Sequence, residues 1–140
     1  KILAELLEYC QSLDTNFLFV ISPYVETELH RENYNYLKKV ISKYGYNFVN
    51  SNEYYNKIKI DFTNDYYNEN HVNVFGAEKY TEFLASYIVK NYHIKNKKSD
   101  KKYTDWNESY KGWQTRLTDA KNQINLIIET KQPNRKEKIK

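Results

Sequence analysis

The residue types that could do acid–base chemistry gather in one polar stretch. Its single histidine, His71, stands among aspartate, glutamate and asparagine, directly before an apolar pattern typical of a helix; the stretch runs Asn64-Asp65-Tyr66-Tyr67-Asn68-Glu69-Asn70-His71-Val72-Asn73. An imidazole beside a carboxylate is a common general base, because the acceptor fixes the ring tautomer and stabilises the cation formed on proton transfer. The pattern therefore predicts an acid–base site at His71, with a solvent-exposed or helix-capping histidine as the alternative.

The partner of His71 is less clearly specified. Asp65 stands six residues before the histidine, Glu69 two before it and Asn68 three before it. An asparagine oxygen can accept the imidazole N–H but cannot neutralise an imidazolium, so we expect Asp65 to be the partner slightly ahead of Asn68. An Asx turn that shapes the loop is the alternative for both. His71 with Asp65 and Glu69 could also hold a divalent metal, but nothing in the spacing selects a metal, so we expect no metal and no cofactor.

Three further residues of the stretch could contact a substrate. Tyr66 and Tyr67 could line a sugar-binding cleft, with aromatic packing of the loop as the alternative. Asn73 could hydrogen-bond the loop beneath the histidine, in a structural or a substrate-binding role. Ser22 also follows an apolar run, but Ser-Pro lacks the glycine-rich elbow of a nucleophilic serine, so we interpret it as a turn residue.

Composition bounds the class of protein. The chain has 140 residues with 40% hydrophobic and 29% charged residues, which is typical of one globular domain. No apolar run is long enough to cross a membrane, and the single cysteine, Cys10, excludes a disulfide framework and a cysteine-based zinc site. His30 and His93 lack partners at metal-ligand spacing, so we expect surface positions. The chain opens at Lys1 in mid-helix without a cap, and we expect it to be a segment of a longer protein.

The spacing of apolar residues predicts the elements that must position this stretch. Helices are expected over residues 2–13, 28–44 and 76–92, with another that carries the apolar residues between 113 and 128 and ends before Pro133. Buried strands are expected over 17–21 and 46–50, and residues 57–60 are either a third strand or a turn. This order predicts a doubly wound α/β sheet with covering helices, which binds ligands at loops 22–28 and 61–74.

Charge divides the chain. Residues 1–92 carry a net charge of −3, and residues 93–140 carry +7. We expect residues 1–92 to form the α/β domain, and residues 93–140 to be a basic linker and an amphipathic helix that packs on it. Residues 133–140 are expected to fray.

Several quoted stretches together resemble a known family. The pattern Asp-Tyr-Tyr-Asn-x-x-His-Val-Asn-x-x-Gly-Ala-x-Lys-x-Thr, beginning at Asp65, resembles the C-terminal block of SGNH (GDSL-type) hydrolases. It is most similar to a Gram-positive branch encoded beside cell-envelope O-acyltransferases. Three more stretches fit this branch, and the resemblance covers most of residues 1–115: Leu18-Phe19-Val20 running into Ser22-Pro23-Tyr24, Lys43-Tyr44-Gly45, and Lys102-Tyr103-Thr104-Asp105-Trp106.

The resemblance implies a flavodoxin-like three-layer parallel sheet and a Ser-His-Asp triad with His71 as the base. It implies an O-acyl ester of cell-envelope carbohydrate as substrate and a membrane O-acyltransferase as partner. We expect no specific nucleic acid as a partner. It also implies an extracytoplasmic location, with a membrane anchor in an N-terminal segment outside these residues.

The sequence departs from the family twice. No Gly-Asp-Ser block occurs in these 140 residues, so the nucleophile is expected upstream of Lys1 and the bare chain is expected to be inactive. The family's acid usually stands three residues before the histidine, where this chain has Asn68. Replacing the triad aspartate by asparagine costs about 10⁴ in turnover in a serine protease.

Two other functions remain open. Asn68 is compatible with a non-catalytic binding or scaffold domain of the same fold. The basic C-terminal region could instead bind a polyanion, because aromatic residues are interspersed among its lysines: Tyr103, Trp106, Tyr110 and Trp113. A lysine-rich amphipathic helix is the alternative for this region. An exposed edge strand would also allow a homodimer.

Overall fold

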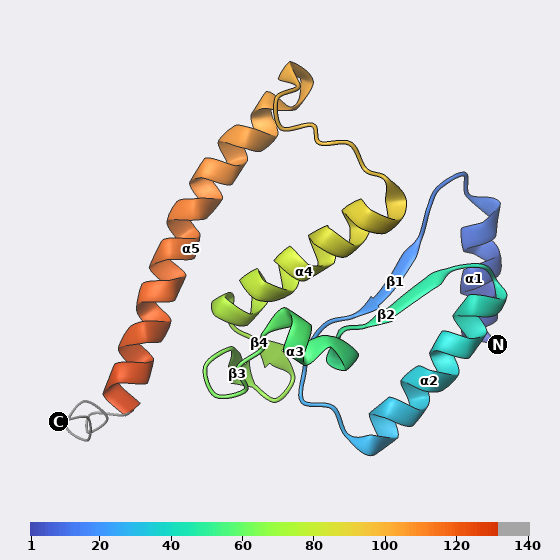
Figure 1. The fold of residues 1–140 in the computed structure, drawn as a ribbon, viewed down its shortest axis with the longest axis horizontal. Coiled ribbons are helices and arrows are strands. Elements are labelled where there is room, and N and C mark those ends of the chain that lie inside the picture. The colour runs from blue at the N-terminus through green and yellow to red at the C-terminus, as the bar shows by residue number, and fades with distance from the viewer. Residues whose placement is uncertain (132–140) are drawn as a thin grey trace. The chain divides into compact units, whose positions relative to one another are not determined.

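The computed structural model describes residues 1–131, and the expected fraying of residues 133–140 lies outside the described residues (Figure 1). The chain forms two compact units, Lys1–Tyr80 and Thr81–Lys140. The packing of the C-terminal helix on residues 1–92 and the homodimer both stay predictions.

The first unit is built around one parallel strand pair. Helix α1 (Ile2–Ser12) precedes strand β1 (Leu18–Ile21), and helix α2 (Glu28–Lys43) connects it to strand β2 (Asn47–Asn50), as Figure 1 shows. The two strands pair in parallel from Leu18 opposite Asn47 to Ile21 opposite Asn50. These four elements confirm the sequence predictions to within two residues at their ends.

Local sequence explains where α2 begins and ends. Thr27 caps its first turn, since the Thr27 hydroxyl accepts the His30 N–H while His30 Nδ1 accepts the Thr27 N–H. Gly45 follows the helix with a φ of +83°, a left-handed conformation that favours glycine. The core of the unit is formed by side chains that are at most 4% exposed: Leu7, Cys10, Ile41, Val49 and Ile58.

The predicted flavodoxin-like three-layer sheet is wrong. The structure is 65% helical, and its described strands form only two separate two-stranded sheets. The 57–60 stretch is not a third parallel strand: it contains the end of helix α3 (Tyr55–Ile58), which follows the 3₁₀ helix η1 (Ser51–Tyr54). Lys59 takes a left-handed φ of 61° and Ile60 N–H donates to the Tyr55 carbonyl, which closes the helix. Alternation over four residues was too short to distinguish a strand from one helical turn.

The second sheet lies where the sequence predicts only a loop. Strand β3 (Tyr66–Asn68) and strand β4 (His71–Val72) form a short antiparallel hairpin. It leads into helix α4 (Val74–Tyr92), which crosses the boundary between the two units.

The second unit is helical in its described part. After α4 the chain is non-helical from His93 to Asp100, as predicted for the basic linker, and then forms the 3₁₀ helix η2 (Lys101–Tyr103). Helix α5 (Thr104–Lys131) reaches the last described residue, so the predicted helix end before Pro133 lies outside the described residues. None of the helices within residues 1–131 is both long enough and apolar enough to cross a membrane.

Candidate active site

The turn of the β3–β4 hairpin holds the histidine that the sequence singles out. Asn68 and His71 face each other in the hairpin register. The Asn68 Oδ1 atom accepts the Asn70 N–H at 2.9 Å and lies 3.0 Å from His71 Nδ1. We call residues Asn68 to His71 the loop tip; all four are exposed.

These two contacts determine the tautomer of the histidine. Because the Asn70 N–H can only donate, the Asn68 atom that it contacts must be the carbonyl oxygen rather than the amide nitrogen. The same oxygen faces His71 Nδ1, so Nδ1 must carry the hydrogen. In the neutral ring Nε2 then holds the lone pair. Nε2 has no hydrogen-bond partner among the described residues, so this arrangement can accept a proton from an external hydroxyl.

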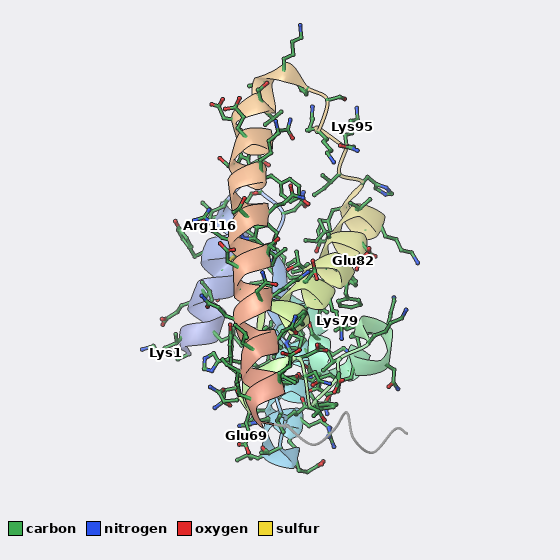
Figure 2. All side chains as sticks on the ribbon, turned by 90° about the vertical axis from the view of Figure 1, so that its left-hand side faces the viewer. Lys1, Glu69, Lys79, Glu82, Lys95 and Arg116 are labelled. Carbon is green, nitrogen blue, oxygen red and sulfur yellow. The ribbon has the colours of Figure 1, made fainter. Side chains whose placement is uncertain are left out.

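Asp65 is not the partner of His71, contrary to the expected ranking. Its side chain is 2% exposed, and its Oδ2 atom accepts from Lys79 Nζ at 2.6 Å and from the Asp61 N–H at 2.7 Å. The sequence argument favoured Asp65 because a carboxylate is the stronger partner for an imidazolium. The hairpin instead sets Asn68 opposite the histidine, while Asp65 pairs with Lys79. Figure 2 labels Lys79 on the ribbon of α4.

Asn73 joins this buried pair to the start of α4. Its Oδ1 atom accepts the N–H groups of Phe75 and Gly76, at 2.9 Å and 3.3 Å, and thus caps the helix. Its Nδ2 atom donates to the Asn64 carbonyl at 2.6 Å, and its N–H donates to the Asp65 carbonyl at 2.8 Å. With these bonds made and only 3% of Asn73 exposed, the geometry fits the structural role considered for it rather than substrate binding.

Gly76 allows the helix to approach the loop. A Cβ atom at this position would overlap the Asp65 carbonyl oxygen and lie 2.9 Å from Val72 Cβ. The conspicuous Asn-x-x-Gly spacing of the sequence is therefore explained by packing and capping.

We call the group that holds the loop on α4 the loop base: Asp61, Asp65, Asn73, Gly76 and Lys79.

The two candidate tyrosines have different surroundings. The Tyr66 ring stacks on Phe62, with ring centroids 5.8 Å apart, and Phe62 in turn packs edge-on against Tyr55. Burial raises the pKa of Tyr66. This is the aromatic packing considered as the alternative for Tyr66. Tyr67 is 64% exposed next to the loop tip and remains available to contact a ligand.

The two loops expected to bind ligands do meet. The Val25 N–H, in the loop after β1, donates to the Glu69 carbonyl of the loop tip at 2.7 Å. The bond fixes the turn that carries His71 against the segment at the carboxyl end of β1. Glu69 itself enters this arrangement through its backbone.

A buried polar network that the sequence reasoning missed supports that segment. The Asn50 amide donates to Glu26 at 3.0 Å, and Asn52 Oδ1 accepts both the Tyr24 N–H at 2.9 Å and the Tyr55 hydroxyl at 2.8 Å. Asn50 and Asn52 are buried. Three consecutive polar residues that begin at the last residue of β2, Asn50-Ser51-Asn52, were the signal that could have indicated it.

Comparisons with known proteins give no relatives: no family model, curated protein or solved structure matches this chain. The SGNH-type resemblance therefore stays an expectation based on the residues quoted for it. Within residues 1–131, no group of three His, Cys, Asp or Glu side chains is arranged to hold a metal ion.

Proposed function

We propose that this chain carries the histidine half of an acyl-transfer site, in which His71 is the general base and Asn68 its orienting partner. The proposal is supported by the two contacts of the Asn68 side-chain oxygen. The contact with the Asn70 N–H identifies this atom as the oxygen, and the contact with His71 Nδ1 therefore favours the Nδ1–H tautomer of His71. That tautomer directs the Nε2 lone pair outward, as a base that activates a hydroxyl requires.

In this proposal a serine supplies the nucleophile, and the 140 residues contain no Gly-Asp-Ser block to provide it. His71 Nε2 takes the hydroxyl proton as the serine oxygen attacks the acyl carbon, and it then returns the proton to the departing oxygen. By resemblance the acyl group comes from an O-acylated cell-envelope carbohydrate, with a membrane O-acyltransferase as the partner. Exposed Tyr67, next to the loop tip, is a suitable surface for a sugar ring.

Asn68 sets the expected strength of this base. Its oxygen orients the ring but carries no charge to stabilise the imidazolium that forms during the reaction. We therefore expect a slow reaction, and we expect Asn68→Asp to accelerate it at least about tenfold. This gain is smaller than the factor of roughly 10⁴ in turnover that a serine protease loses when its triad aspartate is replaced by asparagine.

The tautomer can be tested on the 140-residue chain itself by two-bond ¹H–¹⁵N correlation spectra of the histidines. At neutral pH we expect the neutral ring of His71 to be the Nδ1–H form. His30 is an internal control with the opposite tautomer, because its Nδ1 accepts the Thr27 N–H and the hydrogen of its neutral ring is therefore on Nε2. An Nε2–H form at His71 would remove the support for the proposal.

The activity is tested with the full gene product and a serine-reactive fluorophosphonate. We expect labelling that His71→Ala abolishes, Asn68→Asp accelerates and His30→Ala leaves unchanged. The bare 140-residue chain should not be labelled. Labelling that persists in His71→Ala would show that another base activates the serine.

The second candidate is a non-catalytic scaffold, which the uncharged Asn68 favours. It predicts no labelling of the full gene product, either with the natural residue or with Asn68→Asp. Slow labelling accelerated by Asn68→Asp would exclude it.

A further inference from the structure

One peptide unit connects the loop tip to the segment after β1. The Val25 N–H donates to the Glu69 carbonyl at 2.7 Å. This carbonyl and the Asn70 N–H belong to the same peptide unit, and that N–H donates to the Asn68 side-chain oxygen at 2.9 Å. A peptide unit is planar and rigid, so holding its carbonyl also directs its N–H. Val25 therefore helps to place the Asn68 oxygen that lies 3.0 Å from His71 Nδ1.

The peptide unit that carries the Val25 N–H is itself held by Tyr55. Its carbonyl is that of Tyr24, and the Tyr55 hydroxyl donates to this oxygen. The Tyr55 hydroxyl also lies 2.8 Å from Asn52 Oδ1, which accepts the Tyr24 N–H at 2.9 Å. Burial, followed by the proximity of Tyr66, raises the pKa of Tyr55, so its hydroxyl keeps its hydrogen at neutral pH. The Tyr55 hydroxyl and the Asn52 side chain thus fix the carbonyl and the N–H of Tyr24.

The position of Tyr55 is fixed by its surroundings. It begins helix α3, and its ring packs edge-on against Phe62 with the centroids 4.8 Å apart. Asn52, which contacts the Tyr55 hydroxyl, is 6% exposed, and its N–H and Nδ2 both donate to Asn50 Oδ1. A side chain held by packing and by buried hydrogen bonds can fix the groups that it contacts.

We propose that Tyr55 is a positioning residue for His71. It acts through two rigid peptide units, one after Tyr24 and one after Glu69, and these hold the Asn68 oxygen at His71 Nδ1. No direct contact between Tyr55 and His71 is required. The proposal rests on the proposed function in that it takes His71 as the base, but the state of the ring can be measured without a reaction.

Two tyrosine-to-phenylalanine substitutions form a matched pair. Tyr55→Phe removes the hydroxyl that bonds the Tyr24 backbone. Tyr34→Phe removes the hydroxyl that accepts from the Tyr24 side-chain hydroxyl at 2.7 Å. Each variant loses one oxygen next to Tyr24, so the difference between them reports on the backbone contact. Circular dichroism should show that both variants are folded.

The first measurements use the 140-residue chain. In Tyr55→Phe we expect the Val25 amide hydrogen to exchange with solvent about fivefold faster, because the peptide unit that carries it has lost a hydrogen bond. We also expect mixed tautomers of His71 in two-bond ¹H–¹⁵N spectra, in place of the Nδ1–H form. Tyr34→Phe should change neither the exchange rate nor the spectrum of His71.

A double variant tests the route through Asn68. If Tyr55 acts on His71 only through the Asn68 oxygen, Tyr55→Phe should cause no further change in the His71 spectrum of an Asn68→Ala chain. A further change in that chain would overturn the proposal. So would an unchanged His71 spectrum in the single variant Tyr55→Phe, or an equal change in Tyr34→Phe.

The same pair of variants in the full gene product separates this proposal from the function proposed for His71. With the serine-reactive fluorophosphonate we expect Tyr55→Phe to be labelled at least about tenfold more slowly, because the base is displaced, and Tyr34→Phe to be labelled at the natural rate. If the natural protein is not labelled, the acyl-transfer function fails, and the His71 spectra decide the role of Tyr55 on their own. Labelling of the natural protein that Tyr55→Phe leaves unchanged would overturn that role.

Discussion

The loop base and the loop tip use similar residue types for different purposes. In the base, the Asp65 carboxylate is buried and bonded to Lys79, and the Asn73 side chain bonds on both sides. In the tip, Asn68 and His71 bond to each other and to one neighbouring N–H, and they remain exposed. The charged residue is therefore in the scaffold, and the uncharged amide serves the histidine.

This contrast teaches that residue type alone does not identify a catalytic partner. The base stabilises the fold because the polar groups of its buried residues, Asp65 and Asn73, are hydrogen-bonded away from water. In the tip, His71 Nε2 has no hydrogen-bond partner among the described residues. A nitrogen without a partner contributes little to stability, but a general base needs its free lone pair to accept a proton. Changes in the base should therefore reduce stability, and changes in the tip should alter the histidine alone.

The largest effect is expected from Gly76→Ala. The new methyl group would overlap the Asp65 carbonyl oxygen, so the loop base must separate from α4, and we expect a loss of about 3 kcal/mol in the free energy of unfolding. Gly112→Ala is the matched control, because a Cβ atom there meets nothing within 4 Å and alanine favours a helix. Denaturant melts of both variants measure the difference, and equal stabilities would contradict the packing described for Gly76.

The next effect concerns the buried ion pair. Lys79→Met leaves the Asp65 carboxylate with the Asp61 N–H but no cation, and we expect a loss of about 2 kcal/mol, reduced from the value for a fully buried pair because Lys79 is 37% exposed. Adding Asp65→Asn to Lys79→Met should recover part of the loss. A double-mutant cycle measures this coupling, and strictly additive losses would show that the two groups do not interact.

How far the sequence predicts this arrangement differs between elements. The apolar periodicity and Gly45 were sufficient for α1, β1, α2 and β2, because each is long or sharply bounded. The number of strands in the sheet was not predictable, because four alternating residues fit a helical turn as well as a strand.

The site was predictable in part. The position of His71 in a polar loop before a helix followed from residue types. Its pairing with Asn68 did not, because the pairing depends on the register of a hairpin too short to show in the sequence. The Glu26–Asn50 bond was missed because it joins residues distant in the chain.

The same kind of substitution, asparagine to alanine, can be made in the base and in the tip, at Asn73 and at Asn68. Asn73→Ala removes the cap of α4 and the bond to the Asn64 carbonyl, and should cost about 1.5 kcal/mol. Asn68→Ala removes only exposed bonds, and should cost about 0.5 kcal/mol or less. The same Asn68→Ala chain should give mixed tautomers at His71 in ¹H–¹⁵N spectra, whereas Asn73→Ala should leave the Nδ1–H form wherever the loop stays folded. Equal effects of the two substitutions on stability would remove the distinction between base and tip.

The smallest effect is a dependence on pH at the edge of the loop base. The Asn64 side-chain amide, followed by the Thr63 N–H, holds the pKa of the Asp61 carboxyl below its ordinary value. Since the folded chain has the lower pKa, Asp61 contributes to stability above the pKa of the unfolded chain, and the contribution is lost as the pH falls through the folded value. Asp61→Asn keeps an oxygen for the two N–H groups of the turn but removes the charge. The stability of the natural chain relative to this variant should therefore rise between about pH 3 and pH 5, in denaturant melts at each pH. Because Asp61 is exposed, water competes for its bonds and the rise should be smaller than the effects in the buried part of the base. A relative stability that stays flat over this range would show that the bonds to Asp61 do not depend on its charge.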